Sequence, residues 1–267
     1  MKNQKATKIA VLLLAVFMVI GCFAGCKNND KEDELIIGIT YFAPMNYLDS
    51  DGKTLIGFET EFAKAVCDKI GMKAKFQEIK WETKEIELNG NQIDCIWNGM
   101  TIDEEKKENM QLSVPYMQNK QVAVVRKENA DKYKDLTDLK DAKIVAESKS
   151  AGETVATKNE TFKEASYTPV DSQAKALMEV KSKTADICLV DYVLTIGSIG
   201  AGTSYEDLVI IDKDFAPEEY GIAFKKGNTE LCDKVNAAIQ ELANEGKLNE
   251  IAQKYKLQDL LLLKPNK

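Results

Sequence analysis

The stretch IDCIWNGMTIDEEKK, Ile93–Lys107, is the part of the sequence that decides the fold. Its apolar half, Ile93–Trp97, predicts a short buried strand that ends at the turn pair Asn98-Gly99. Thr101 is then expected to open a helix, because Glu104 follows it in the Ser/Thr-x-x-Glu capping pattern. This arrangement would bring a glycine carbonyl, a hydroxyl and free helix N–H groups to one point, which suits a small zwitterion. An ordinary capped strand–turn–helix would carry the same pattern.

Residues 1–25 are typical of a bacterial signal peptide. Three lysines precede an unbroken apolar run, Ile9–Ile20, which is too short to span a bilayer because a spanning helix needs about 20 residues. Two small-residue-plus-cysteine sequences follow and resemble the lipobox, in which the cysteine after the cleavage site is acylated, for example with palmitate. The polar tether 26–34 favours Cys26 as the lipidated residue, whereas Val19 favours Cys22. A plain secretory signal with incidental cysteines is the alternative.

Composition excludes several classes of function. The net charge is −7 for the whole chain and −10 without residues 1–25, which carry three lysines and no acidic residue. An acidic surface argues against nucleic acid or anionic lipid as a partner. The chain has no histidine, which excludes histidine-based triads and metal sites. We therefore predict no catalytic residue, no metal and no cofactor.

The four remaining cysteines are far apart and form no CxxC motif, so three disulfide pairings are conceivable. Each lies among apolar residues, which favours small buried side chains without a bridge. They are Cys67, Cys95, Cys188 and Cys232.

About 230 residues follow the tether, enough for two modest domains. Apolar runs predict strands at Ile36–Ile39, Ala74–Ile79, Ile93–Trp97, Gln121–Val125, Lys143–Ala146, Ile187–Val190 and Tyr220–Phe224. Helical spacing predicts helices at Phe58–Ile70, Lys84–Leu88, Ala174–Val180, Leu231–Leu242 and Leu248–Tyr255, and Ser150 begins a second capping pattern. Alternating strands and helices predict two α/β lobes with parallel sheets, whose ligands bind at the carboxyl ends of strands. Gly99 and Asp191 hold that position in the two lobes.

Five segments in this order resemble the polar-amino-acid solute-binding proteins of ABC importers, the family-3 periplasmic binding proteins. The resemblance runs from about Glu34 to Leu257. The segments are GITYFAPMNYLDSDGKTLIGFETEFAKAV, IDCIWNGMTIDEEKK, LSVPYMQNKQVAVVRK, ADICLVD and EEYGIAFKKGN.

The resemblance implies a ligand site at matching positions. Phe42, two residues before a loop proline, and Trp81 match the aromatic walls of the family's site. Gly99, through its carbonyl, and Thr101, through its hydroxyl, match the groups that receive the α-ammonium. Asp191 matches the carboxylate that completes the ammonium site.

For the α-carboxylate, the resemblance points to the backbone N–H groups of Ser150 and Ala151. The family usually has an arginine five residues after the Thr101 position, but this chain has Lys106 there. A lysine is a point charge without the planar two-pronged fork of arginine. Lys106 could make one contact, Lys107 could help, or the ligand could lack a standard α-carboxylate.

Less specific signals suggest that Tyr41, Met45, Glu85 and Asn98 shape a side-chain pocket. Each of the stronger candidates also has an ordinary structural explanation. Asp191 could cap a following helix, Trp81 could be a core residue, and Lys106 could lie on a solvated face.

The resemblance implies a two-lobe periplasmic-binding-protein type II fold, with a cleft between lobes joined by two hinge strands. Lobe 1 would comprise 35–122 and 221–258, lobe 2 would comprise 123–220, and 259–267 would form a tail. The expected function is capture of a free amino acid by a monomeric, lipid-anchored extracytoplasmic receptor that delivers it to an ABC permease. The alternatives are a cyclohexadienyl-type dehydratase on the same fold, or a sensor lipoprotein.

Overall fold

The computed structural model describes residues 33–211, 213, 215 and 217–265. The signal segment 1–25, the lipidation candidates Cys22 and Cys26, and most of the tether 26–34 lie outside these residues. Among the helices of the described part, none is long and apolar enough to cross a membrane.

The elements alternate along the chain as a βα-rich fold requires. The strands are β1 (Glu34–Ile39), β2 (Tyr47–Leu48), β3 (Leu55–Ile56), β4 (Lys73–Glu78), β5 (Cys95–Thr101), β6 (Met110–Leu112), β7 (Met117–Arg126), β8 (Lys143–Glu147), β9 (Ser166–Val170), β10 (Ile187–Asp191), β11 (Leu208–Ile211) and β12 (Pro217–Lys225). The α-helices are α2 (Phe58–Ile70), α3 (Lys84–Asn89), α4 (Glu104–Asn109), α5 (Ala130–Tyr133), α6 (Ala151–Lys158), α7 (Gln173–Lys181), α8 (Tyr192–Ser198), α9 (Thr229–Asn244) and α10 (Lys247–Lys254). Short 3₁₀ helices are η1 (Trp81–Thr83), η2 (Lys127–Asn129), η3 (Glu160–Phe162) and η4 (Gln258–Leu260).

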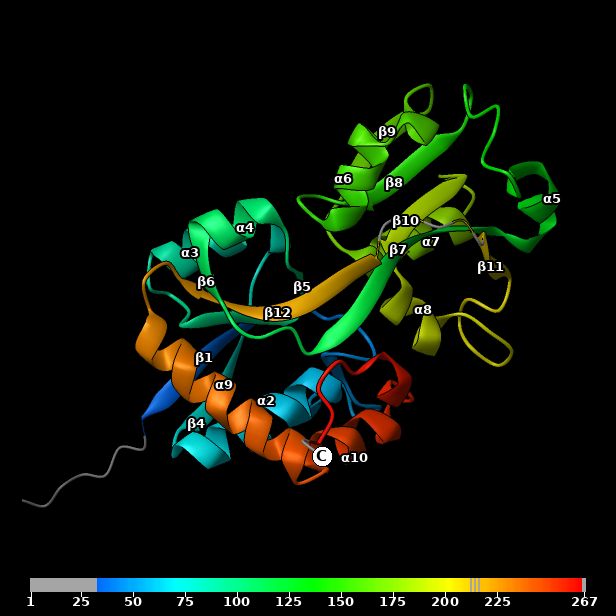
Figure 1. The fold of residues 1–267 in the computed structure, drawn as a ribbon. Coiled ribbons are helices and arrows are strands. Elements are labelled where there is room, and N and C mark those ends of the chain that lie inside the picture. The colour runs from blue at the N-terminus through cyan, green and yellow to red at the C-terminus, as the bar shows by residue number, and fades with distance from the viewer. Residues whose placement is uncertain (1–32, 212, 214, 216, 266–267) are drawn as a thin grey trace, which may run out of the picture. The chain divides into compact units, whose positions relative to one another are not determined.

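The hydrogen-bonded strands follow the order β4-β1-β5-β12-β7-β10-β8-β9. The strands β1, β4 and β5 pair in parallel at one end, and β8, β9 and β10 pair in parallel at the other. Between them, β7 and β12 run antiparallel to their neighbours. Helices α2, α9 and α10 pack beside the first group and α6 and α7 beside the second, so the unit Asp33–Lys267 has two lobes (Figure 1).

The two longest strands of the crossing region pair with each other. Met117–Lys120 of β7 pairs with Pro217–Tyr220 of β12. This pairing lies beside the lobe boundaries that the resemblance implied, at 122/123 and 220/221. Two strands therefore connect the lobes side by side.

Local sequence explains the best-predicted helix. Phe58, Phe62 and Val66 of α2 are fully buried on one face, and Phe62 packs edge-on against Trp97 with ring centroids 5.1 Å apart. Gly71 ends the helix in the left-handed conformation, with φ of 71°, and its N–H donates to the Cys67 carbonyl. An αL glycine that satisfies a terminal carbonyl is the expected end of such a helix.

The decisive stretch folds differently from its prediction in two respects. The strand is β5, which runs to Thr101 instead of ending at Trp97, and Gly99 lies within it at φ of 58°. The helix starts at Glu104, and its capping residue is Asp103, which accepts from the Lys106 N–H at 2.8 Å. The expectation that Thr101 caps the helix was therefore wrong, because an aspartate two residues later offers a better-placed acceptor.

Several elements were not predicted. In β9, Pro169 lacks an N–H, but this strand pairs only with β8 in the described sheet and so tolerates proline at its edge.

Part of the expected C-terminal tail is also ordered, because Leu261 forms a bridge with Met117 and is buried. The four cysteines of the described part are buried free thiols.

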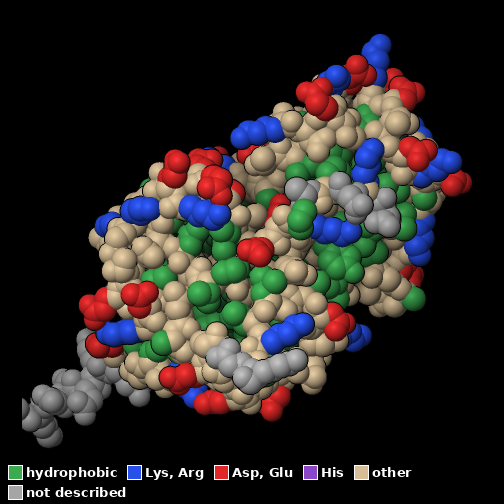
Figure 2. All heavy atoms as spheres, viewed as in Figure 1, with side chains coloured by type: hydrophobic (Ala, Val, Ile, Leu, Met, Phe, Trp, Pro, Cys, Tyr) green, Lys and Arg blue, Asp and Glu red, His purple; other side chains and the backbone are tan. Residues whose placement is uncertain are grey.

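Figure 2 shows lysine, aspartate and glutamate side chains interspersed around the visible face, with hydrophobic side chains between them. The charges of both signs are therefore mixed on this face, which shows no broad patch of a single sign.

Candidate ligand-binding cleft

The eight ligand-binding residues suggested by the sequence line one cavity. They are Phe42, Trp81, Gly99, Thr101, Lys106, Ser150, Ala151 and Asp191. The first five belong to the chain before β7 and the last three to the β8–β10 half, so both lobes contribute. Of the weaker candidates, Tyr41 and Asn98 also line the cavity. Met45 is instead fully buried in the core and Glu85 is exposed on α3, so neither prediction holds.

The wall around Gly99 is closely packed. A Cβ at Gly99 would lie 2.8 Å from Cε1 of the Phe42 ring, and its φ of 58° is unfavourable for other residues. Its N–H donates to Glu59 Oε1 at 2.8 Å. Burial raises the pKa of the Glu59 carboxyl to about 7. The absence of a side chain at Gly99 thus lets the β5 backbone approach the Phe42 ring. The hydrogen bond to the buried Glu59 fixes the position of the Gly99 N–H.

Trp81 begins η1 and is only 7% exposed. Lys84 lies over its ring, with Nζ 4.5 Å from the centroid. The ammonium also donates to the Trp81 carbonyl at 3.2 Å and to the Lys149 carbonyl at 3.1 Å. Since Lys149 lies in the other lobe, Lys84 forms a hydrogen bond across the cleft.

Asp191 is buried at the end of β10, and its side chain makes no capping hydrogen bond to α8. Its carboxylate accepts hydrogen bonds from the side-chain amides of Asn119 (2.6 Å), Gln121 and Gln173. Burial raises the pKa of Asp191, although these donors oppose the shift. The capping explanation for Asp191 therefore fails. The three amides hold its carboxylate in place, and Asp191 lines the cavity, where it can pair with a cation.

A second acid, Glu218 of β12, adjoins this network. Its Oε2 accepts from Thr101 Oγ1 at 3.1 Å and from the amides of Asn119 (2.9 Å) and Gln121 (3.1 Å). Burial and the charge of Asp191 both raise the pKa of Glu218. The Thr101 hydroxyl, by donating to Glu218, turns its lone pairs toward other donors. Asp191 and the Thr101 hydroxyl oxygen thus give the cavity an acceptor-rich side suited to a cation, and Glu218, which does not line the cavity, orients the hydroxyl.

The opposite side of the cavity is rich in donors. Ser150 caps α6 by accepting from the Glu153 N–H at 3.1 Å, as the second capping pattern predicted. The N–H groups of the first helical turn have no partner within a helix, and they favour an anion. A Cβ at Gly152 would lie 2.7 Å from the Leu189 carbonyl, so glycine allows this turn to pack against β10.

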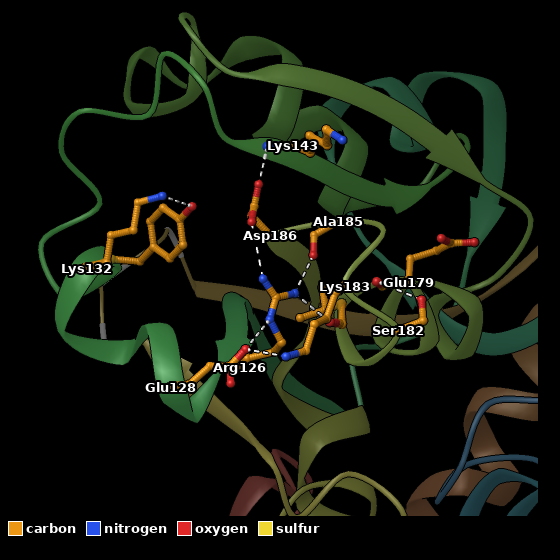
Figure 3. Close-up of polar contacts among 11 residues, drawn as sticks. Arg126, Glu128, Lys132, Lys143, Glu179, Ser182, Lys183, Ala185 and Asp186 are labelled. Carbon is orange, nitrogen blue, oxygen red and sulfur yellow. Dashed lines mark hydrogen bonds and ion pairs between the residues drawn. The ribbon is translucent and has the colours of Figure 1, made fainter.

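Lys106 lines the cavity but also pairs with Asp103, and its side chain is 17% exposed. The only arginine of the chain, Arg126, is far in sequence from this position and has another role. Its guanidinium donates to the Val180 and Ala185 carbonyls, at 2.7 Å each, and pairs with Asp186 at 3.3 Å (Figure 3). The cavity lining of the described residues therefore contains lysine and no arginine.

Sequence reasoning missed several residues of the site. Glu147, Lys149, Ser172 and Gln173 line the cavity, the amides of Asn119 and Gln121 orient Asp191, and Glu218 accepts from the Thr101 hydroxyl. The Asn-x-Gln alternation of Asn119 and Gln121, both buried, breaks the apolar pattern of β7 and could have signalled inward-facing amides. No group of three or more acidic or cysteine side chains in the described residues is arranged to hold a metal ion.

The comparisons with known proteins bear on the family and the fold. The profile of the bacterial extracellular solute-binding proteins, family 3, matches residues 35–258. The L-cystine-binding protein TcyJ of Escherichia coli (strain K12) is 28% identical over 262 residues, with 95% of each chain covered. The ABC transporter glutamine-binding protein GlnH of Bacillus subtilis (strain 168) is 30% identical over 242 residues, covering 88% of this chain and 85% of the relative.

Among solved structures, an ancestral arginine-binding protein bound to arginine is 31% identical and superposes with a TM-score of 0.76. The match covers 84% of this chain and 98% of that one. The two lobes are thus those of the type II periplasmic amino-acid-binding fold. Because the family profile spans nearly all of the described chain, the protein belongs to family 3 of the bacterial extracellular solute-binding proteins.

Proposed function

We propose that the protein captures one free α-amino acid in the cleft between its lobes and delivers it to an ABC permease. The observation that carries the proposal is the cavity itself, in which an acceptor-rich site and a donor-rich helix start face a common space. An amino acid presents an ammonium and a carboxylate a few ångströms apart, which complements this pair of sites.

The α-ammonium is assigned to Asp191, the Thr101 hydroxyl and the Gly99 carbonyl. A buried charge is tolerated only when it is paired and hydrogen-bonded. Asp191 is already oriented by three amides, so it needs little rearrangement to accept an ammonium. The α-carboxylate is assigned to the first N–H groups of α6 at Ser150 and Ala151, with Lys106, which also lines the cavity, as its side-chain cation.

Capture is proposed to proceed by hinge closure about β7 and β12, the two strands that link the lobes. Lobe 1 (35–122 and 221–258) would bind the ligand first between Phe42 and Trp81. Closure would then bring Asp191 and the start of α6 from lobe 2 (123–220) onto it. The hydrogen bond from Lys84 to the Lys149 carbonyl favours the closed form.

The cellular role rests on the family and on the N-terminus. Family members are extracellular solute-binding proteins, and the named relatives bind amino acids. We infer that the chain is secreted, is anchored to the membrane by a lipid on Cys26 or Cys22, acts as a monomer and contacts the permease in its closed form. Mass spectrometry of the membrane-extracted protein would identify the acylated cysteine.

Calorimetry of the purified protein with each common amino acid and with cystine tests the function. We expect one ligand per chain, a Kd near 1 μM (about −8.2 kcal/mol) and no chemical turnover. Trp81 fluorescence should change on saturation and the change should be lost in Trp81→Phe, while Trp97→Phe, in the core, should keep it. Absence of heat and of any fluorescence change with every ligand would overturn the proposal, and conversion of a cyclohexadienyl acid would favour the enzyme instead.

A further inference from the structure

Glu147 is the last residue of β8 and lines the cavity, yet it plays no part in the ammonium or carboxylate sites. It is only 4% exposed. Its Oε1 is buried and receives no hydrogen bond from any residue that the structure describes. A buried carboxylate without a donor is unfavourable unless another group satisfies it.

The other buried acids of the cleft differ from Glu147 in this respect. Asp191 accepts from three side-chain amides, and Glu218 accepts from Thr101 and two of the same amides. Glu59 accepts from Asn46, from the Gly99 N–H and from the Tyr116 hydroxyl. Among these four acids, Glu147 alone lacks a donor to one of its buried oxygens.

The lysines that line or flank the cavity do not supply that donor. Lys84 donates to two carbonyls and lies over the Trp81 ring, and Lys106 pairs with Asp103. In the described part of the chain, no lysine or arginine nitrogen lies within 4.0 Å of the Glu147 carboxylate. Burial raises the pKa of Glu147 to about 8, and the charge of Asp191 adds to the shift while Lys84 opposes it. Lys84 thus acts on Glu147 only from a distance.

We propose that the side chain of the captured amino acid ends in a cationic group, an ammonium or a guanidinium, and that Glu147 is its carboxylate partner. This inference rests on the proposed function, because the α-ammonium is already assigned to Asp191 and a second cation is what the cavity lacks. Arginine, lysine and cystine share this chemistry, since each carries a cationic nitrogen at its far end. A neutral ligand would leave Glu147 without a charged partner.

The test measures affinity by calorimetry at pH 7 for ligand pairs that differ in the distal cation. The pairs are arginine with citrulline, lysine with norleucine, and cystine with the mixed disulfide of cysteine and 3-mercaptopropionate. We expect the wild-type protein to favour the cationic member of at least one pair by roughly tenfold or more. This comparison needs no variant, so it holds even if a substitution impairs folding.

The variant Glu147→Gln should then lose most of that preference, because the amide keeps the size but not the charge. Glu82→Gln, an exposed glutamate next to Trp81, makes the same chemical change outside the cavity and should keep it. Tight binding of a neutral amino acid, with no preference for a cation and no effect of Glu147→Gln, would overturn the inference and leave the proposed function intact. Absence of binding by any amino acid would overturn both.

Discussion

Asp191 and Glu218 accept hydrogen bonds from the same two side-chain amides, those of Asn119 and Gln121. Asp191 belongs to β10 and Glu218 to β12, and both amides project from β7, which lies between those strands. The donors therefore hold two carboxylates from different strands beside one another. Like charges raise each other's pKa, so this pair is poised to gain from a cation that binds against it.

Replacing Asp191 with asparagine should weaken the binding of a cationic group at this position. Asp191→Asn keeps the size of the side chain but takes away the charge that faces the ligand ammonium, and we expect a loss of about 2–5 kcal/mol in binding free energy. The thermal stability of the ligand-free protein should not fall, because a buried charge is lost. Calorimetry and thermal melts measure the two quantities. Wild-type affinity in the variant would show that Asp191 is structural only.

Lys106 should contribute less to ligand affinity than Asp191, because its ammonium also pairs with Asp103. We expect Lys106→Ala to weaken binding by about 1–2 kcal/mol and Lys106→Arg to keep or improve it, since a guanidinium suits a carboxylate. Lys107→Ala is the matched control, because Lys107 pairs with Glu104 on the outer side of the same helix and does not line the cavity. Equal affinities in all three variants would place Lys106 on a merely solvated face.

The fold could be predicted in large part because its signals are local. The helix that starts at Phe58 has its apolar spacing and its terminal glycine within a few turns, and the Ser150 cap lies three residues from its partner. The start of α4 was misplaced because Thr101 and Asp103 both offer capping oxygens. Only the backbone path through Gly99, which keeps Thr101 in β5, decides between them.

The site could be predicted only in part. The eight residues transferred from the family resemblance converge on one cavity, but the residues that orient them were missed. Asn119 and Glu218 lie opposite each other because Met117–Lys120 pairs with Pro217–Tyr220. These strands are about a hundred residues apart, and the sequence of neither one predicts the register of their pairing. In the sequence, Glu147 looks like an acidic residue that ends a strand and faces solvent. Its burial becomes visible only in the folded structure, where it lines the cavity between the lobes.

Gly99 offers a test of the close approach between backbone and aromatic wall. Gly99→Ala combines an unfavourable φ with a contact of 2.8 Å to Phe42, so we expect a loss of more than about 2 kcal/mol in stability and weaker ligand binding. Gly71→Ala is the control, because Gly71 has a φ of 71° but nothing within 4 Å of an added Cβ. It should cost about 1–2 kcal/mol and leave binding unchanged. Equal effects on binding would contradict the packing argument.

Glu147 predicts how the stability of the ligand-free protein depends on pH. Its pKa rises from 4.5 in the unfolded chain to about 8 in the folded protein, mainly because of burial. Between these values the folded protein keeps a proton that the unfolded chain has released, so this residue lowers stability as the pH rises. Below pH 4.5 the effect vanishes, and above about pH 8 it is complete.

Glu147→Gln removes this titration. We expect the variant and the wild type to be equally stable near pH 4.5, and the variant to gain an advantage of the order of a few kcal/mol by pH 7.5. Urea unfolding at a series of pH values measures the difference, in which the contributions of Glu59 and Glu218 largely cancel because both proteins carry them. Glu82→Gln makes the same chemical change at an exposed site and is the matched control. A difference between variant and wild type that stays constant across the series would mean that Glu147 is not the buried, unpaired acid of the cleft.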